Sequence, residues 1–231
     1  MTAQIPFTID PAVREALPGI CVGVVEARGV DNSLPDRPEV DALLDDAVQR
    51  AEKLLASTKA SEDPRVQPYR AAFHALGMSP SRYPSSNIAL LRRIAKGKGL
   101  WRVNPVVDLG NAISISYGLP LGAHSMATGE ALELRFSREH DRFVELGASD
   151  DDPTLEPGEL VYTAGNLVHT RRWTWRQSEN GKVELAPALD LLFPIDGFIS
   201  VNDDQVMTAC DDLAQKLRSI FGCEATVRLC E

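Results

Sequence analysis

The chain has 231 residues, 44% of them hydrophobic, and a formal net charge of −9 at pH 7. That length can bury a sizeable core without disulfide or metal support. The four cysteines form no CxxC pair and have no metal-ligand spacing with the four histidines, so we expect reduced thiols, no metal and no cofactor. With no run of about 18 apolar residues and no basic leader, we expect a cytoplasmic protein.

The charge is distributed unevenly along the chain. Between Arg65 and Val107 there is no Asp or Glu, whereas eight Lys or Arg residues occur there, leaving 16 basic and 33 acidic residues elsewhere. Such an asymmetry indicates a face that binds a polyanion. The alternative is a solvated helix face whose charges are balanced by acids from other parts of the fold.

The first part of the chain predicts one strand and three helices. The predicted elements are a turn at Asp10-Pro11, a buried strand over 20–25, and helices over 39–56, 66–76 and 87–96. The strand is β-branched throughout most of its length, and apolar residues of the first helix recur every three or four positions. Ser85-Ser86 offers an N-cap for the third helix, and Gly77 ends the second.

The second part is richer in strand patterns. Over 106–117 we expect a short helical turn leading into a strand, because residues 113–117 alternate in a β-like manner. Further strands are expected over 132–136, 143–146, 160–163, 170–176, 191–195 and 225–230, and a terminal amphipathic helix over 203–221. This mixture predicts an α+β (mixed α/β) fold.

Several fragments between Tyr69 and Gln177 occur together in a fixed order. They are YR at 69–70, GMSPSRY at 77–83, ALLRR at 89–93, NPVVDLGN at 104–111, GLPLGAH at 118–124, PGELVY at 157–162 and RRWTWRQ at 171–177. The ordered set resembles the B3/B4 domain, the tRNA-editing module of the phenylalanyl-tRNA synthetase beta subunit.

The resemblance implies a fold and an activity. Residues 1–231 are expected to form a single B3/B4-like domain, or two intimately packed lobes, with mixed sheets flanked by helices. Free-standing proteins of this kind are similar to trans-editing deacylases, including forms that clear canavanine from tRNA. The implied partner is the aminoacylated acceptor end of tRNA.

The sequence also departs from the family pattern. A histidine that follows the G-x-P element in the synthetases is replaced by Gly122, and a pocket glutamate is replaced near Leu192 or Phe193. The amino acid specificity of the synthetase domain is therefore not carried over to this chain.

Candidate catalytic residues lie in the segment 110–124. Asn111, Ser114 and Ser116 could present amide and hydroxyl groups to the ester or the ribose, although Asn111 could equally cap a helix. His124 could activate a water or be structural. Gly110, Gly118 and Gly122 would let the backbone approach a ligand closely.

The remaining candidates bind substrate and tRNA. Tyr83 could stack on the terminal adenosine or pack on the core. In the strand predicted over 170–176, Arg172 and Arg176 share one face and Trp173 and Trp175 the inward face. The residues expected to contact tRNA are Arg82, Arg92, Arg93, Lys96, Lys98 and Arg102.

Three functions remain open at this point. The first is a trans-editing hydrolase that deacylates mis-charged aminoacyl-tRNA by substrate-assisted water attack, which needs no triad because the ester is already activated. The second is a non-catalytic tRNA-binding or amino-acid-sensing module, which Gly122 favours. The third is a small-molecule amidase or esterase unrelated to tRNA.

Overall fold

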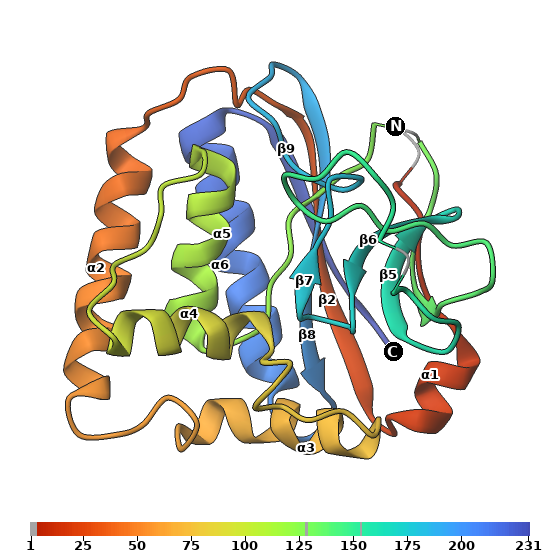
Figure 1. Cartoon of the computed structure of the whole chain (residues 1–231). Helices are drawn as coiled ribbons and strands as arrows, with labels where there is room; N and C mark the ends of the chain where they lie inside the picture. Colours follow the sequence, from red (N-terminus) through yellow and green to blue (C-terminus); the bar gives the residue numbers. More distant parts are fainter. Residues whose placement is uncertain (1–3, 128, 153) are drawn as a thin grey trace.

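The computed structural model describes residues 4–127, 129–152 and 154–231, which form two β-sheets and a set of helices (Figure 1). The helices are α1 (Pro11–Ala16), α2 (Pro38–Leu55), α3 (Gln67–Ala75), α4 (Ser86–Ala95), α5 (Pro105–Tyr117) and α6 (Asp203–Phe221), with a 3-10 turn at Pro64–Val66. The strands are β1 (Phe7–Ile9), β2 (Ile20–Val30), β3 (His124–Ser125), β4 (Leu132–Phe136), β5 (Leu160–Ala164), β6 (Leu167–Arg171), β7 (Arg176–Gln177), β8 (Leu189–Phe198) and β9 (Glu224–Cys230). The predicted α+β class is confirmed.

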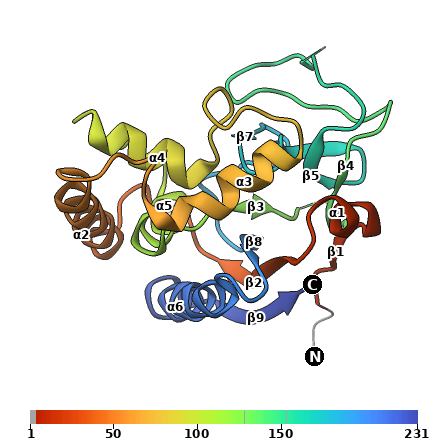
Figure 2. The same ribbon diagram turned by 90° about the horizontal axis from the view of Figure 1, so that it is seen from below.

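A four-stranded antiparallel sheet lies at the centre, in the order β3-β8-β2-β9. α6 packs on one face of this sheet, as the view from below shows (Figure 2). Two glycines make that contact close. A Cβ on Gly23 would lie 2.5 Å from Cys210 Sγ, and one on Gly197 would lie 2.5 Å from Val206 Cγ2. The other face of the sheet is therefore the one available for a ligand site.

A second sheet of five strands, in the order β1-β4-β5-β6-β7, lies beside the open face of the central sheet. β1 runs parallel to β4, and the remaining pairs are antiparallel. Trp173 and Tyr162 are buried between the sheets, and both donate hydrogen bonds to Asp196 of β8. This contact joins the two sheets at one point.

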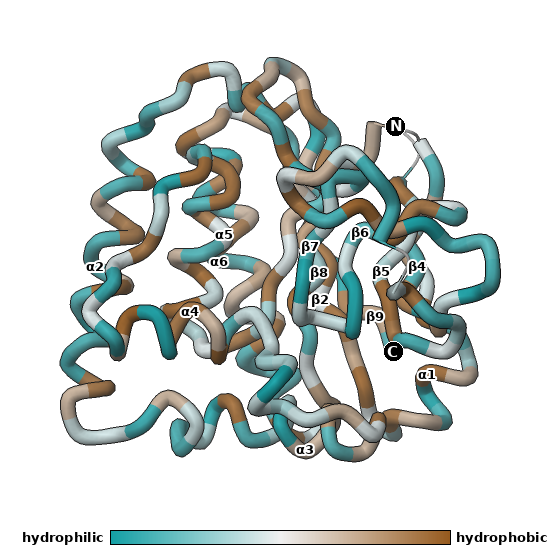
Figure 3. The backbone as a smooth tube through the Cα atoms, viewed as in Figure 1, coloured by the Kyte–Doolittle hydropathy of each residue, from teal (hydrophilic) through white to brown (hydrophobic). Residues whose placement is uncertain are grey.

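α2, α4 and α5 lie together on the side of the molecule next to α6, whereas α1 lies beside the second sheet and α3 lies at the bottom of the view (Figure 1). α5 packs against α2, α4 and α6, and the largest of these contacts is with α2. The backbone trace coloured by hydropathy shows hydrophobic and hydrophilic residues alternating along α2, as expected for a helix with one buried face (Figure 3). None of the helices formed by the described residues combines the length and apolar character needed to cross a bilayer.

The region 106–117 differs from the prediction, because all of it is helical. Asn104 accepts a hydrogen bond from the Val107 N–H, Pro105 occupies the first turn, and Gly118 ends the helix with φ of 70°. Nine of the thirteen residues of α5 are buried, so the helix is enclosed on most of its sides. The prediction of a strand over 113–117 is therefore wrong. A buried helix does not need the polar face that gives a surface helix its 3.6-residue periodicity, so its sequence can alternate like that of a strand.

The strand predicted over 170–176 is also wrong. β6 ends at Arg171, a turn follows, and β7 begins at Arg176. Arg172 and Trp173 adopt left-handed conformations, with φ of 50° and 60°, so the alternating faces proposed for 172–176 do not exist. Residues 143–146 form only isolated bridges rather than a strand.

Candidate functional site

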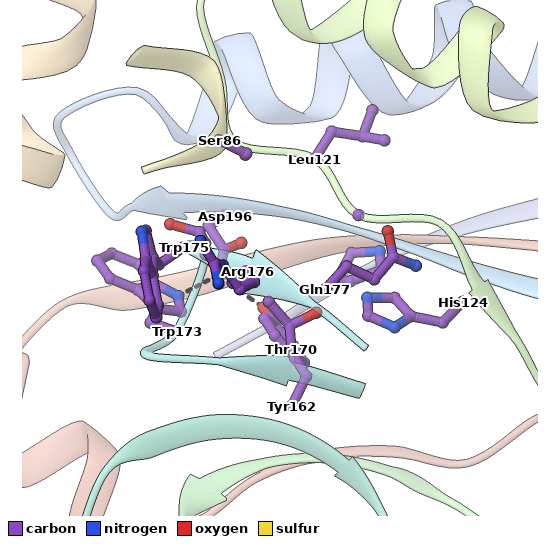
Figure 4. Close-up of a pocket in the computed structure, with 13 residues that line it drawn as sticks. Ser86, Leu121, His124, Tyr162, Thr170, Trp173, Trp175, Arg176, Gln177 and Asp196 are labelled. Carbon is purple, nitrogen blue, oxygen red and sulfur yellow. Dashed lines mark hydrogen bonds between the residues drawn. The ribbon is translucent and has the colours of Figure 1, made fainter. Parts of the chain in front are cut away.

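A pocket of about 390 Å³, its mouth included, lies between the two sheets (Figure 4). Its polar lining residues are Ser86, His124, Thr170, Thr174, Arg176, Gln177 and Asp196. Its apolar and aromatic lining comes from Leu121, Gly122, Tyr162, Trp173, Trp175 and Pro194. The pocket is thus built from the loop before β3, the start of α4, the β6–β7 turn and β8.

Asp196 lies at the floor of this pocket and is 1% exposed. Successive residues of a strand point to opposite faces, so Asp196 faces the second sheet because Gly197 faces α6. Its Oδ1 accepts hydrogen bonds from Tyr162 Oη and Trp173 Nε1, both at 2.6 Å. Burial raises the pKa of Asp196 to about 7, although both hydrogen bonds favour the carboxylate. Near neutral pH this carboxyl group therefore populates both protonation states.

His124 forms part of the pocket wall and is fully buried. Its ring stacks on His169, with 5.5 Å between centroids, and lies 5.6 Å from the Tyr162 ring. Burial, together with the neighbouring His169, lowers the pKa of His124 well below 6.5. A neutral imidazole has one N–H donor and one nitrogen acceptor, and His124 can offer both to a ligand.

Gly122 is what allows His124 to occupy this position. A Cβ on Gly122 would lie 2.6 Å from His124 Nε2. Any other residue at position 122 would push the ring away from the pocket. Gly122 thus makes room for the imidazole of the residue two positions later.

Four buried polar atoms of this pocket have no hydrogen-bond partner among the described residues. They are His124 Nδ1, His124 Nε2, Ser86 Oγ and Thr174 Oγ1. Buried polar groups in native proteins are almost always hydrogen-bonded. Their convergence on one cavity indicates a site for a polar ligand.

The mouth of the pocket carries aromatic rings and guanidinium groups. Tyr83 and Trp175 pack edge to face with 4.9 Å between centroids. The Arg172 guanidinium lies 4.1 Å from the Tyr83 ring centroid, and that of Arg176 lies 4.5 Å from the Trp175 ring centroid. Both arginines also form ion pairs, Arg172 with Glu159 and Arg176 with Glu145. Tyr83 and Arg172 therefore lie at the rim, next to the pocket lining.

Five of the residues predicted to form the ester pocket do not line it. Ser114 Oγ donates to the Leu119 carbonyl at 2.7 Å, and Ser116 lines a different surface hollow together with Arg50. Asn111 lies in the middle of α5 and is not a helix cap. Gly110 lies within α5 and faces the side chain of Leu121, which follows the helix. Gly118 is the C-cap of α5. The structure brings together only His124, Gly122 and Arg176 from the predicted set.

The predicted tRNA-binding residues gather around α4. Arg92 and Arg93 lie in its last turn, and Lys96 and Lys98 follow it in exposed positions. Among the described residues, none of these four forms an ion pair with an acidic group. Arg82 is exposed near the rim, 5.1 Å from the Tyr83 ring centroid. Arg102 differs from the rest because it pairs with Asp41 and Asp45 of α2, which is the charge-balanced alternative for this position.

Sequence reasoning missed Asp196, Tyr162, Thr174 and Gln177. A signal was present for Asp196, because it is a lone carboxylate inside the apolar strand of residues 191–198. Buried acidic residues are rare unless they are paired or functional. The others lie in the fragments at 157–162 and 171–177, but those fragments do not show which of their side chains face a cavity: Tyr162 reaches it from β5, and Thr174 and Gln177 reach it from the β6–β7 turn and β7.

The sequence matches the B3/4 domain family over residues 68–222, which is well over half of the chain. The chain therefore belongs to the B3/4 domain family. A comparison with curated proteins finds no significant match.

The fold is similar to that of an N-terminal fragment of the phenylalanyl-tRNA synthetase beta subunit from Pyrococcus horikoshii. The TM-score is 0.51 at 9% sequence identity, over 96% of this chain and 50% of that fragment. At this identity the likeness concerns the fold alone, and the chain spans half the length of the fragment. The expected B3/B4-like fold is confirmed.

Proposed function

We propose that this protein is a trans-editing hydrolase that removes the amino acid from mis-charged aminoacyl-tRNA in the pocket between its two sheets. The observation that carries the proposal is a group of buried polar atoms of His124, Ser86 and Thr174 that have no hydrogen-bond partner among the described residues and that belong to the lining of one cavity in a B3/4 domain. Because charged tRNA is used at the ribosome, the activity belongs in the cytoplasm.

The proposed reaction is hydrolysis of an ester. Water adds to the carbonyl carbon, the bond between that carbon and the ribose oxygen breaks, and the ribose oxygen gains a proton. An aminoacyl ester is already activated, so positioning of the water and hydrogen bonds to the developing oxyanion contribute most of the catalysis. In our proposal the vicinal ribose hydroxyl assists the attack.

The pocket residues have separate tasks in this proposal. The neutral His124 imidazole donates to or accepts from the aminoacyl group, and its lowered pKa makes it a weak base. Asp196 Oδ2 accepts no hydrogen bond from the described residues, whereas Oδ1 accepts two. That free oxygen is available to a donor group of the substrate.

The surface around α4 supplies the proposed contact with tRNA phosphates. Arg92 lies close enough to Arg70 that the repulsion, after burial, lowers its pKa. Arg70 Nη1 is buried without a hydrogen-bond partner in the part of the chain that is described. A phosphate between the two guanidinium groups would offset the repulsion between Arg92 and Arg70 and would accept a hydrogen bond from Arg70.

The test is a panel of mis-charged tRNAs incubated with the protein, with release of the amino acid followed over time. We expect at least one member to lose its amino acid faster than in buffer alone. If all members bind but none is hydrolysed, the protein is a non-catalytic tRNA-binding module. If small esters are hydrolysed and no tRNA binds, it is an esterase unrelated to tRNA.

A further inference from the structure

The loop after α4 carries an exposed tryptophan that no part of the pocket uses. Trp101 is 71% exposed, and Val103 close by is 61% exposed. The other two tryptophans of the chain are buried or half-buried. A single exposed apolar side chain needs no explanation by itself, so the groups around this indole decide what the surface could bind.

Trp101 is held in place by a basic residue. The Arg93 guanidinium lies 3.4 Å from the Trp101 ring centroid, so it covers one face of the indole. Arg93 Nη2 also donates to the Lys98 carbonyl at 3.5 Å, which ties the loop back to α4. With one face covered and most of the side chain exposed, the opposite face of the indole is open to solvent.

Basic residues precede and follow Trp101 along the chain, and the one that follows, Arg102, is paired with Asp41 and Asp45. Arg92 lies in the last turn of α4 and Lys96 caps its C-terminus, and both line a wide surface hollow together with hydroxyl groups of the 57–61 loop and the Lys59–Glu62 ion pair. Lys98 is exposed in the same loop as Trp101. Among the described residues, no acidic side chain forms an ion pair with Arg92, Arg93, Lys96 or Lys98. A guanidinium-backed aromatic ring next to unpaired cations matches the chemistry of single-stranded nucleic acid, with its flat bases and phosphates.

The position of this surface relative to the pocket is defined by α4. Ser86 at the start of the helix lines the pocket, and Arg93 lies seven residues further on. At 1.5 Å per residue the two are separated by about 10 Å along the helix axis. Trp101 is therefore within the reach of the nucleotides that precede an RNA terminus bound in the pocket.

We propose that Trp101 is a stacking platform for an unpaired base of the RNA partner, with Arg93 backing the indole and Arg92, Lys96 and Lys98 binding the flanking phosphates. The inference rests on the RNA partner of the proposed function but not on its hydrolytic step. The platform adds affinity without reading sequence, because every base presents a flat π-face.

Two substitutions at one position separate stacking from mere apolar contact. Trp101→Leu removes the aromatic face and Trp101→Phe retains one. We expect Trp101→Leu to weaken tRNA binding about 5- to 100-fold, and Trp101→Phe to recover most of the loss. The matched control is Leu146→Ala, which removes an exposed apolar side chain elsewhere and should not change the affinity.

The salt dependence of binding gives a second readout. Trp101→Leu removes no charge, so the slope of log affinity against log salt should stay as in the wild type. Lys96→Ala should reduce that slope by about one unit, as expected for a lost phosphate contact.

Fluorescence gives a third readout, and it needs no hydrolysis. Uncharged tRNA should quench a component of the emission that is missing in Trp101→Phe. Equal tRNA affinity of wild type and Trp101→Leu, or a loss that Trp101→Phe does not reduce, would overturn the platform. Normal quenching with no hydrolysis of any mis-charged tRNA would support the platform and refute only the proposed activity.

Discussion

Asp196 illustrates how a single buried carboxyl group links stability to pH. Its pKa is raised to about 7, against about 3.9 for an unfolded aspartate. Because the folded protein holds this proton more tightly than the unfolded chain, its contribution to stability is fully present at low pH. That contribution is lost as the pH rises from about 4 to about 7.

We therefore expect Asp196→Asn to flatten the pH dependence of stability. Asparagine cannot ionise, and its carbonyl oxygen can still accept from Tyr162 and Trp173. Thermal unfolding between about pH 5 and pH 8 should show a smaller decline in the variant than in the wild type. Parallel declines in the two proteins would contradict the raised pKa.

Gly122 provides a test of the position of His124. Gly122→Ala places a Cβ 2.6 Å from His124 Nε2 and should displace the ring, since burial leaves it little room. We expect single-turnover deacylation to fall no further than in His124→Ala, which is by less than about 10²-fold.

The matched control for this variant is Gly110→Ala. Its Cβ would meet only a flexible Leu121 side chain, at 3.1 Å, and its φ is not left-handed. Deacylation by Gly110→Ala should stay near the wild-type rate. Similar losses in the two variants would mean that general packing, rather than the imidazole, is responsible.

At the same scale, sequence patterns located part of the pocket. His124, Gly122 and Arg176 lie in family fragments and line the cavity. Asn111 and Ser114 lie in an equally good fragment but belong to the buried helix α5. A linear motif cannot distinguish residues that face a ligand from residues that hold the scaffold, because both are required by the fold.

Among the elements, those with strong helical periodicity were predicted well and those near turns were not. The helix predicted over 203–221 has the bounds of α6, and the strand predicted over 132–136 has those of β4. The turn between β6 and β7 could not be predicted, because Arg172 and Trp173 are left-handed without being glycine. Such a conformation is unfavourable locally, and we attribute its persistence to the Trp173 contacts with Asp196 and with the core.

The contact between α6 and the central sheet yields a prediction about stability. Gly23→Ala introduces a Cβ 2.5 Å from Cys210 Sγ and 2.6 Å from Val206 Cγ1. We expect the free energy of unfolding to fall by about 1–3 kcal/mol, the usual cost of overpacking a core. Denaturant unfolding measures the change.

A second substitution checks the cause of that loss. Cys210→Ala removes the nearest clashing atom. The loss of unfolding free energy in the double variant should therefore be smaller than the sum of the losses in the two single variants. Simple additivity would show that Gly23 is needed for another reason.

At the scale of the whole molecule, several cations of the acid-free segment lie on α4 and in the loop that follows it. Most of these cations are unpaired among the described residues, whereas Arg102 is balanced by Asp41 and Asp45 of α2. Sequence alone could not separate these two cases, because α2 and Arg102 are distant along the chain and meet only through packing. Unpaired cations and a charge-balanced arginine thus both occur in the acid-free segment, at different positions.

The central claim is that one pocket removes amino acids from tRNA with help from the vicinal ribose hydroxyl. The most direct measurement is single-turnover deacylation of a mis-charged tRNA that the panel identifies, compared with the same tRNA lacking that hydroxyl, for the wild type and His124→Ala. We predict that the deoxy substrate binds nearly normally but is hydrolysed far more slowly, and that His124→Ala costs less than the roughly 10²–10⁴-fold expected of a general base. Normal hydrolysis of the deoxy substrate together with an inactive His124→Ala variant would contradict the account and identify His124 as the base.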